Sequence, residues 1–239
     1  MVAWCPAVNS GVAKLTVTAL RSFCGFLHLE GVLRRSLVPA VPTVTYRHQA
    51  GLPKGLEPEE VRRILTSCDT TSDNGVRDLA ILTLLVRLGL RRCEVSRLGL
   101  DDIDWRAGTI CVHGKGNCLE RLPLPVDVGH YLAQYLRHAR PAKARGRTVF
   151  VRHFAPYNAL SECRISTIVA DAARRAGVGR VHAHRLRHTA ATQLLRAGAS
   201  LPEIGQVLRH RRAHTTAIYA KVDRDTLRMI AGPWPEDAQ

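Results

Sequence analysis

Residues 184–223 have the sequence HRLRHTAATQLLRAGASLPEIGQVLRHRRAHTTAIYAKVD, the stretch that decides the fold predicted for this chain. The spacing of its apolar residues predicts a helix over 184–197, on which His184 and Arg187 are three residues apart and therefore neighbours. Ser200 and Glu203 then form the capping box that is typical of a helix start, and a second helix is predicted over 201–209. The stretch therefore predicts two helices in succession, the first with a basic start.

A tyrosine follows these two helices. His210 ends the second helix, Tyr219 lies nine residues further on, and another helix is predicted over 214–221. Taken alone, Tyr219 is typical of a half-buried core residue. His184 and His188 have the i, i+4 spacing of metal ligands, but the glutamate of an H-E-x-x-H site is absent and two arginines separate the histidines. These cations disfavour a metal ion and favour a phosphate group.

Two earlier stretches place cations where a phosphate could be bound. The helix predicted over 76–88 is apolar almost all round and stops at Gly89, and Arg91 and Glu94 follow directly. Lys115 lies between two glycines at the tip of a predicted hairpin, where the backbone can approach a ligand closely. Singly, Arg91 is typical of an arginine that closes a helix, and Lys115 of a solvated turn.

The composition indicates a polyanionic partner. The chain has 239 residues, 46% of them hydrophobic, and its 35 lysines and arginines exceed its 20 acidic residues to give a net charge of +15. Such an excess points first to nucleic acid and second to an anionic membrane surface. The membrane alternative is weak because no apolar run approaches the roughly 20 residues that span a bilayer.

The cysteines and the N-terminus predict a cytoplasmic protein. Seven cysteines without a C-x-x-C pair form neither a zinc ribbon nor a disulfide framework, and they are typical of reduced thiols in the cytosol. The N-terminus lacks the pattern of an export signal. No cluster of carboxylates suits a two-metal nuclease. We therefore expect neither a metal ion nor a cofactor.

The chain is predicted to be mainly α-helical with one small antiparallel β-sheet. A helix over 10–33 precedes proline- and glycine-rich segments, which place a domain boundary near residue 50. Glu57-Pro58-Glu59-Glu60 begins the next helix, and residues 103–105 and 109–112 form a hairpin, with an edge strand over 121–124. The remaining helices are predicted over 126–138, 162–176 and 223–231.

Together these stretches resemble the tyrosine recombinase or phage integrase family, and its Xer-like members in particular, over roughly residues 53–230. The order Arg, Lys, His-x-x-Arg, His, Tyr is the family's active-site order, and the stretch quoted first is similar to its C-terminal signature. The resemblance implies the recombinase catalytic-domain fold over 51–239, with 1–50 as the last helix and linker of an N-terminal core-binding domain. It implies these catalytic residues: Arg91, Lys115, His184, Arg187, His210 and the nucleophile Tyr219, supported by Glu94.

The chemistry of these residue types fits DNA strand cleavage. The two arginines can bind the non-bridging oxygens of a phosphate, Lys115 can protonate the leaving 5′ oxygen, and the histidines can exchange protons near neutral pH. A tyrosine nucleophile would leave a 3′-phosphotyrosine, which preserves the phosphodiester bond energy, so rejoining needs neither ATP nor a metal. We expect four further arginines to contact DNA: Arg185, Arg209, Arg211 and Arg212.

The resemblance also implies partners and leaves alternatives open. The expected partners are double-stranded recombination sites, three further copies of the chain in a tetramer on DNA, and an accessory DNA-bending protein. Three departures stand out: the short N-terminal part, a hairpin one residue longer than in Xer-like relatives, and Arg209 where many members have glycine. A truncated recombinase relic that only binds DNA, and a relaxing type IB topoisomerase-like activity, remain as alternative functions.

Overall fold

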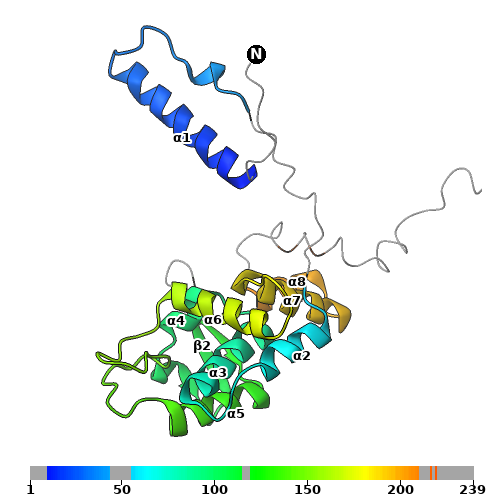
Figure 1. The fold of residues 1–239 in the computed structure, drawn as a ribbon. Helices are drawn as coiled ribbons and strands as arrows, with labels where there is room; N and C mark the ends of the chain where they lie inside the picture. The colour runs from blue at the N-terminus through cyan, green and yellow to red at the C-terminus, as the bar shows by residue number, and fades with distance from the viewer. Residues whose placement is uncertain (1–9, 44–54, 115–118, 210–215, 217–218, 220–239) are drawn as a thin grey trace, which may run out of the picture. The chain divides into compact units, whose positions relative to one another are not determined.

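The computed structural model describes residues 10–43, 55–114, 119–209, 216 and 219 (Figure 1). The chain divides into two compact units, Met1–Ala50 and Gly51–Gln239. That the first unit is the end of a core-binding domain stays a prediction. Among the described residues, none of the helices combines the length and apolar character required to cross a membrane.

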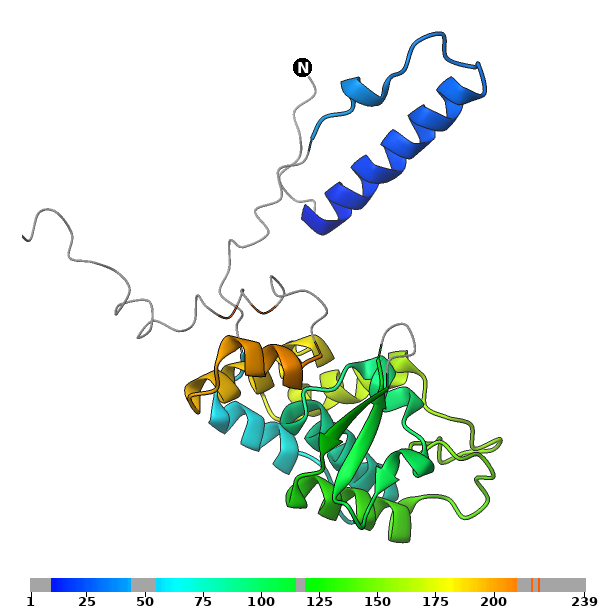
Figure 2. The same ribbon diagram turned by 180° about the vertical axis from the view of Figure 1, so that it is seen from behind.

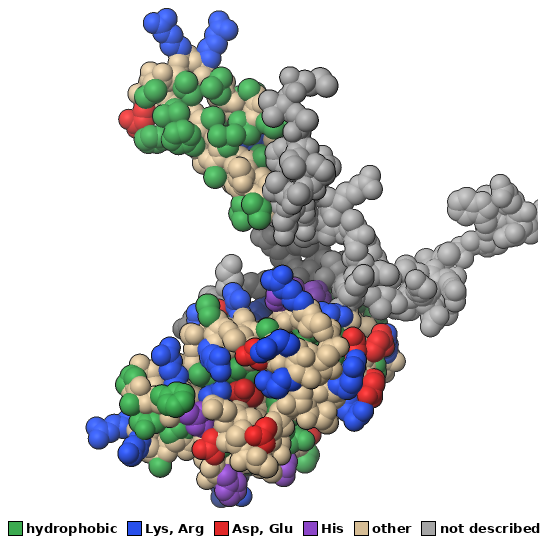
Figure 3. All heavy atoms as spheres, viewed as in Figure 1, with side chains coloured by type: hydrophobic (Ala, Val, Ile, Leu, Met, Phe, Trp, Pro, Cys, Tyr) green, Lys and Arg blue, Asp and Glu red, His purple; other side chains and the backbone are tan. Residues whose placement is uncertain are grey.

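The first unit consists of helix α1, Ser10–Leu29, and a short 3₁₀ turn at Val38–Ala40. The helix ends before the predicted residue 33, because Gly31 adopts a left-handed φ of 74°. The NH of Gly31 donates to the His28 carbonyl at 3.2 Å, a bond typical of a glycine-based helix terminus. One face of α1 exposes large apolar side chains (Figure 3), among them Leu15 and Phe23.

The second unit is mainly helical with one three-stranded antiparallel sheet, which confirms the predicted fold class. The strands β1 (Ile103–Asp104), β2 (Thr109–His113) and β3 (Leu119–Pro123) lie in the order β1-β2-β3, on the side seen in Figure 2. Pro123 lies opposite Thr109 on the edge strand, as expected for a residue without an NH. The helices are α2 (Pro58–Thr66), α3 (Asp73–Arg87), α4 (Arg92–Arg97), α5 (Val126–Gln134), α6 (Glu162–Arg175), α7 (Ala183–Arg196) and α8 (Leu201–Val207).

Helix α3 forms the centre of this unit and contacts α2, α4, α5, α6 and α7. It begins three residues before the predicted start because the Ser72 hydroxyl accepts a hydrogen bond from the NH of Gly75 at 3.1 Å and caps the helix. Ile81, Leu82, Leu84 and Leu85 are fully buried. Each such side chain contributes about 1.5–3 kcal/mol of hydrophobic stabilisation, so the apolar pattern of α3 organises the whole unit.

The remaining helices differ from the predictions mainly at their ends. The helix predicted over 126–138 divides into α5 and a π-helical turn at Tyr135–Ala139. Tyr135 is fully buried, and its hydroxyl accepts a hydrogen bond from the NH of Val151 at 3.3 Å. The capping box of Ser200 and Glu203 is present at the start of α8, as predicted. The hairpin tip with Lys115 and the helix predicted over 223–231 lie outside the described residues.

Gly89 allows the end of α3 to approach α7 and α8 closely. Its φ of 57° is left-handed, and a Cβ atom at this position would lie only 2.6 Å from Leu208 Cδ2 and 3.3 Å from Ala190 Cβ. A glycine is therefore required both by the backbone conformation and by the packing. Because the chain turns here, Arg91 is brought beside α7 and the end of α8.

We expect Gly89→Ala to lower the free energy of unfolding more than Gly177→Ala does. Gly177 also has a left-handed φ, 65°, but a Cβ atom at this position would meet no other atom within 4 Å. Its substitution therefore adds only backbone strain of about 1–2 kcal/mol. At Gly89 overpacking adds about 1–3 kcal/mol to the same strain. Urea denaturation of both variants measures the difference. Equal losses of unfolding free energy in the two variants would show that Leu208 moves away from the added methyl group at no energetic cost.

Candidate active site

Arg91 and Glu94 form a local pair at the start of α4. Arg91 is the N-cap residue, and its NH donates to Glu94 Oε2 at 2.8 Å while its Nη1 donates to Glu94 Oε1 at 2.5 Å. The glutamate side chain is 1% exposed and that of Arg91 is 35% exposed. The carboxylate therefore fixes the direction of an arginine that still reaches solvent.

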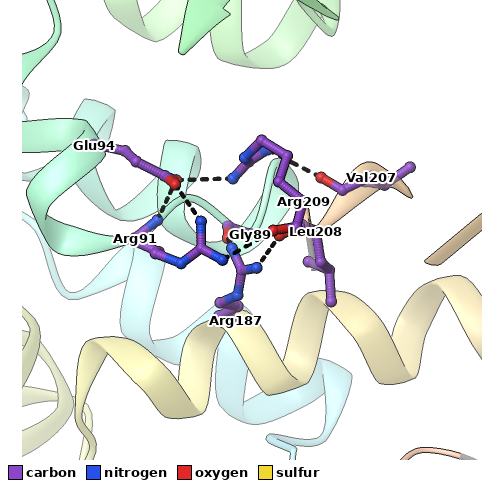
Figure 4. Close-up of polar contacts among 7 residues, drawn as sticks. All are labelled: Gly89, Arg91, Glu94, Arg187, Val207, Leu208 and Arg209. Atoms are coloured by element: carbon purple, nitrogen blue, oxygen red, sulfur yellow. Dashed lines mark hydrogen bonds and ion pairs between the residues drawn. The ribbon is translucent and has the colours of Figure 1, made fainter. Parts of the chain in front are cut away.

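Arg209 binds the same carboxylate from the other side (Figure 4). Its Nη2 donates to Glu94 Oε2 at 2.8 Å, and both side chains of this pair are 1% exposed. The residue has a left-handed φ of 55°, a conformation that is costly for any residue except glycine. In this structure the Arg209 side chain is bound to Glu94, and its predicted contact with DNA stays a prediction.

The two arginines keep Glu94 ionised although it is buried. Burial by itself raises the pKa of this carboxyl, but the charges of Arg209 and Arg91 and the hydrogen bonds from Arg91 outweigh burial and hold the pKa below its ordinary value. One carboxylate is therefore shared by two cations. Because Arg209 supplies a second positive charge, Glu94 does not neutralise Arg91 completely.

Arg187 joins the cluster from α7 (Figure 4). It is 4% exposed, its Nη1 donates to the Gly89 carbonyl at 2.6 Å, and its Nη2 donates to the Leu208 carbonyl. Arg91 Nη2 donates to the next carbonyl, that of Arg209, at 3.1 Å. Both arginines thus bind the carbonyl end of α8, where the helix dipole is negative. Burial, followed by the charges of Arg91 and Arg209, lowers the pKa of Arg187 to about 9, so it remains a cation at neutral pH.

Arg91, His184 and Arg187 line one cavity of about 550 Å³. They come from the start of α4 and from the first turns of α7, which lie almost a hundred residues apart in the chain. Sequence reasoning did not assign the other residues of the wall to the site. These are Leu90, Arg92, Cys93, Glu162, Ser166, His182 and Ala183.

Two histidines on α7 link the cavity to Tyr219. The rings of His184 and His188 meet edge to face, with centroids 4.3 Å apart. His184 keeps contact with solvent, yet its partial burial, followed by the charges of Arg187 and Arg91, lowers its pKa. His188 Nδ1 lies 2.6 Å from the Tyr219 hydroxyl. Among the described residues no group of three metal-binding side chains forms, and His188 instead contacts the predicted nucleophile.

Tyr219 is held between α7 and α8. It is 1% exposed and packs in a cluster with Ala191, Ile204 and Leu208. Its NH donates to the Thr216 carbonyl at 2.9 Å, and Thr216 Oγ1 lies close to Gly205 on α8. The expectation that Tyr219 taken alone is a core residue thus describes its packing well. Burial, only partly offset by Arg187, raises the pKa of its hydroxyl to about 12, so the tyrosine is protonated at neutral pH.

The structure brings four of the six predicted catalytic residues to one region. Arg91, His184 and Arg187 line the cavity, and Tyr219 reaches the region through His188. The other two, Lys115 and His210, lie outside the described residues, as do Arg211 and Arg212. Arg185 on α7 is half-buried. The contact of His188 was missed because the sequence showed it only as a candidate metal ligand.

The sequence profile of the Phage integrase family matches residues 54–225 of this chain. The chain belongs to the phage integrase family. The matched part contains every element from α2 to α8 and the whole predicted catalytic set, Lys115 and His210 included. The resemblance drawn from the signature over 184–223 is thereby confirmed.

Named relatives agree with this membership. The Sinorhizobium fredii protein y4rA, named as an integrase/recombinase, is 45% identical over 97% of this integrase-family chain, which covers 57% of y4rA. The tyrosine recombinase XerD of Listeria innocua is 33% identical over 90% of the chain, which covers 72% of XerD. The chain spans little more than half the length of y4rA and of a second Sinorhizobium fredii relative, y4rF.

Solved structures show the same fold. The structure of the XerA recombinase superimposes on this chain with a TM-score of 0.65 and 25% sequence identity. The match covers 93% of this chain and 76% of the XerA chain. A lambda integrase dimer bound to a core site gives a TM-score of 0.67 over 88% of this chain and 73% of its own. Its identity of 17% shows the fold alone.

Arg209→Gly tests the buried pair of Arg209 and Glu94. The change relieves left-handed strain of about 1 kcal/mol, but the loss of one partner from a buried ion pair costs about 3–5 kcal/mol. We therefore expect urea denaturation to show a net loss of about 2–4 kcal/mol in the free energy of unfolding. Arg147→Ala is the matched control, because Arg147 and Asp101 form an exposed pair whose loss should cost much less than that of the buried pair.

The loss of stability in Arg209→Gly should depend on pH. Because the pKa of Glu94 is lowered in the folded chain, its ionisation stabilises the fold above the unfolded-state pKa, near 4, and this contribution is lost as the pH falls through the lowered pKa. The difference between wild type and Arg209→Gly should therefore shrink as the pH falls below about 4. A difference that is the same at pH 7 and pH 3 would contradict a charge-based role.

Proposed function

We propose that this chain cleaves and rejoins DNA strands at specific sites through a covalent 3′-phosphotyrosine at Tyr219. The observation that supports this most strongly is the convergence of Arg91, His184 and Arg187 on one cavity, with the buried hydroxyl of Tyr219 linked to the same helix through His188. Two arginines and a histidine suit a phosphate, and a buried phenol beside them suits a nucleophile. Names among the relatives, integrase/recombinase and tyrosine recombinase, support the same activity.

In this proposal the two arginines bind the scissile phosphate. A guanidinium has five N–H donors, and the described bonds of Arg91 and Arg187 to protein use only part of each set. The remaining donors can reach the non-bridging oxygens and stabilise the charge of the pentacovalent transition state. Glu94 keeps Arg91 in position, and His184, unprotonated at neutral pH, can exchange a proton with the phosphate oxygens.

The other roles follow from the family resemblance. Lys115 is the proposed general acid for the leaving 5′ oxygen, and His210 a second proton donor to the phosphate. Arg185, Arg211 and Arg212 are proposed contacts to DNA, and the net charge of +15 favours binding of a polyanion. The proposed partners are double-stranded recombination sites, further copies of the chain in a tetramer, and an accessory DNA-bending protein. Solved relatives include XerH on its difH substrate and a lambda integrase tetramer on a Holliday junction.

A covalent adduct tests the function directly. Nicked duplexes that tile the DNA on either side of the gene for this chain trap the phosphotyrosine, because the short cleaved strand diffuses away before rejoining. We expect one duplex to give a protein–DNA adduct on a denaturing gel, and Tyr219→Phe to abolish it. Tyr157→Phe is the matched control and should form the adduct normally, since Tyr157 is not one of the residues that line the cavity. An adduct that survives Tyr219→Phe, or none on any duplex, would refute the proposal.

Lys115→Ala tests the general acid. On the reactive duplex this variant should slow cleavage by about 10²–10⁴-fold, the usual contribution of proton transfer to a leaving group. A duplex with a 5′-thio leaving group needs no proton from the protein, so there the loss should be small. Single-turnover cleavage rates on both duplexes measure the difference. Equal losses on both would remove Lys115 from this role.

A further inference from the structure

The hydroxyl of Tyr219, the proposed nucleophile, is hydrogen-bonded to His188, a residue that the sequence analysis did not place in the site. His188 lies on α7 directly after Arg187, and its Nδ1 is 2.6 Å from the Tyr219 hydroxyl, with ring centroids 5.5 Å apart. The hydroxyl is enclosed by protein, and Tyr219 is 1% exposed. A short bond between a phenol and an imidazole nitrogen, away from water, gives the phenolic proton a defined place to go.

The direction of this bond follows from the surroundings of both rings. Burial, followed by the neighbouring His184 and the charge of Arg187, lowers the pKa of His188 to about 4, whereas burial raises the pKa of Tyr219 to about 12. At neutral pH the tyrosine therefore holds the proton and donates it to an unprotonated Nδ1. The other ring nitrogen, Nε2, then carries the single imidazole hydrogen.

Besides burial, which lowers the pKa of His188 most, the groups that oppose its protonation are groups that would bind a phosphate. His184 contacts its ring at a centroid distance of 4.3 Å, Arg187 is the preceding residue, and both line the cavity together with Arg91. A phosphate in this cavity brings negative charge against these cations. Its binding would therefore offset their effect and make the His188 ring a better proton acceptor when a substrate is present.

We propose that His188 is the residue that accepts the proton of Tyr219 during strand cleavage. The step is balanced within the site. The O–H bond of Tyr219 breaks and its proton passes to His188 Nδ1, while the freed electron pair of the hydroxyl oxygen forms the bond to phosphorus. The bond from phosphorus to the 5′ oxygen breaks, and that oxygen takes a proton from the general acid. Rejoining returns the proton from His188 to the tyrosine.

This inference rests on the proposed strand-cleavage activity and is tested on the duplex that gives the Tyr219 adduct. His188→Gln keeps a hydrogen-bond acceptor beside the tyrosine but cannot take up a proton, and His188→Ala offers neither. We expect both variants to cleave about 10²–10⁴-fold more slowly than wild type at pH 7, and to recover as the pH rises and the phenol ionises without help. A His188→Gln variant within about threefold of wild type would overturn the proposal, because a hydrogen bond would then suffice.

Two further measurements separate proton transfer from a structural role. Imidazole added to His188→Ala should restore cleavage in proportion to the unprotonated imidazole present. 3,5-Difluorotyrosine at position 219, whose phenol is more acidic, should raise the rate of His188→Gln by at least about tenfold and change the wild-type rate much less. The proposal would also be overturned if neither imidazole nor 3,5-difluorotyrosine speeds cleavage by the slow variants and if their cleavage rate falls short of wild type by the same factor at every pH.

The controls distinguish this proposal from the function on which it rests. His138→Gln changes an exposed histidine in the π-helical turn and should cleave at the wild-type rate. Thermal unfolding and non-covalent binding of the duplex establish that the His188 variants fold. No adduct with wild-type chain overturns both proposals, whereas a normal wild-type adduct with unimpaired His188→Gln overturns only the role of His188.

Discussion

The ion pair of Glu94 with two arginines is the interaction on which the arrangement of the site depends. Its carboxylate receives Arg91 from its own helical turn and Arg209 from a position 115 residues further along the chain. The contact with Arg209 lies where solvent is excluded, so the loss of either partner is costly, whereas the Arg91 side chain is 35% exposed. Through this one side chain, the start of α4 is fixed against the end of α8 (Figure 4), and a cavity of about 550 Å³ is lined by Arg91 and Arg187.

The second feature is the state of Tyr219, the proposed nucleophile. Tyr219 is protonated, buried and bonded to His188, while the two cavity arginines bind carbonyls at the end of α8. These hydrogen bonds hold the two arginines and the tyrosine in place. They also connect the arginine-lined cavity with the tyrosine through one helix end, because the Leu208 carbonyl accepts a hydrogen bond from Arg187 and the Leu208 side chain packs against Tyr219. A group that binds these arginines and displaces the carbonyls will therefore alter the surroundings of the tyrosine.

Much of the second unit could be predicted from local patterns. The apolar run of α3, the capping box at Ser200 and the turn between β1 and β2 are set by residues close together in the chain, and the structure agrees with them. The misjudged helix ends have local causes too, such as Gly31 after α1 and the Ser72 cap of α3. The π-helical turn that follows α5 was not predicted, and its first residue, Tyr135, is buried and hydrogen-bonded to the distant Val151, a contact that no local pattern indicated.

The sequence by itself determined the family and the identity of the candidate catalytic residues, because the order and spacing of these residue types within 184–223 and upstream are distinctive. Only the tertiary structure decided what two of its side chains do. Arg209, a predicted DNA contact, is bound to the buried carboxylate of Glu94, and His188, weighed as a metal ligand, contacts Tyr219, 31 residues away. The physical reason is the same for both. The partner of a charged or polar side chain is set by which distant segments fold against it, and spacing along the chain carries no record of that.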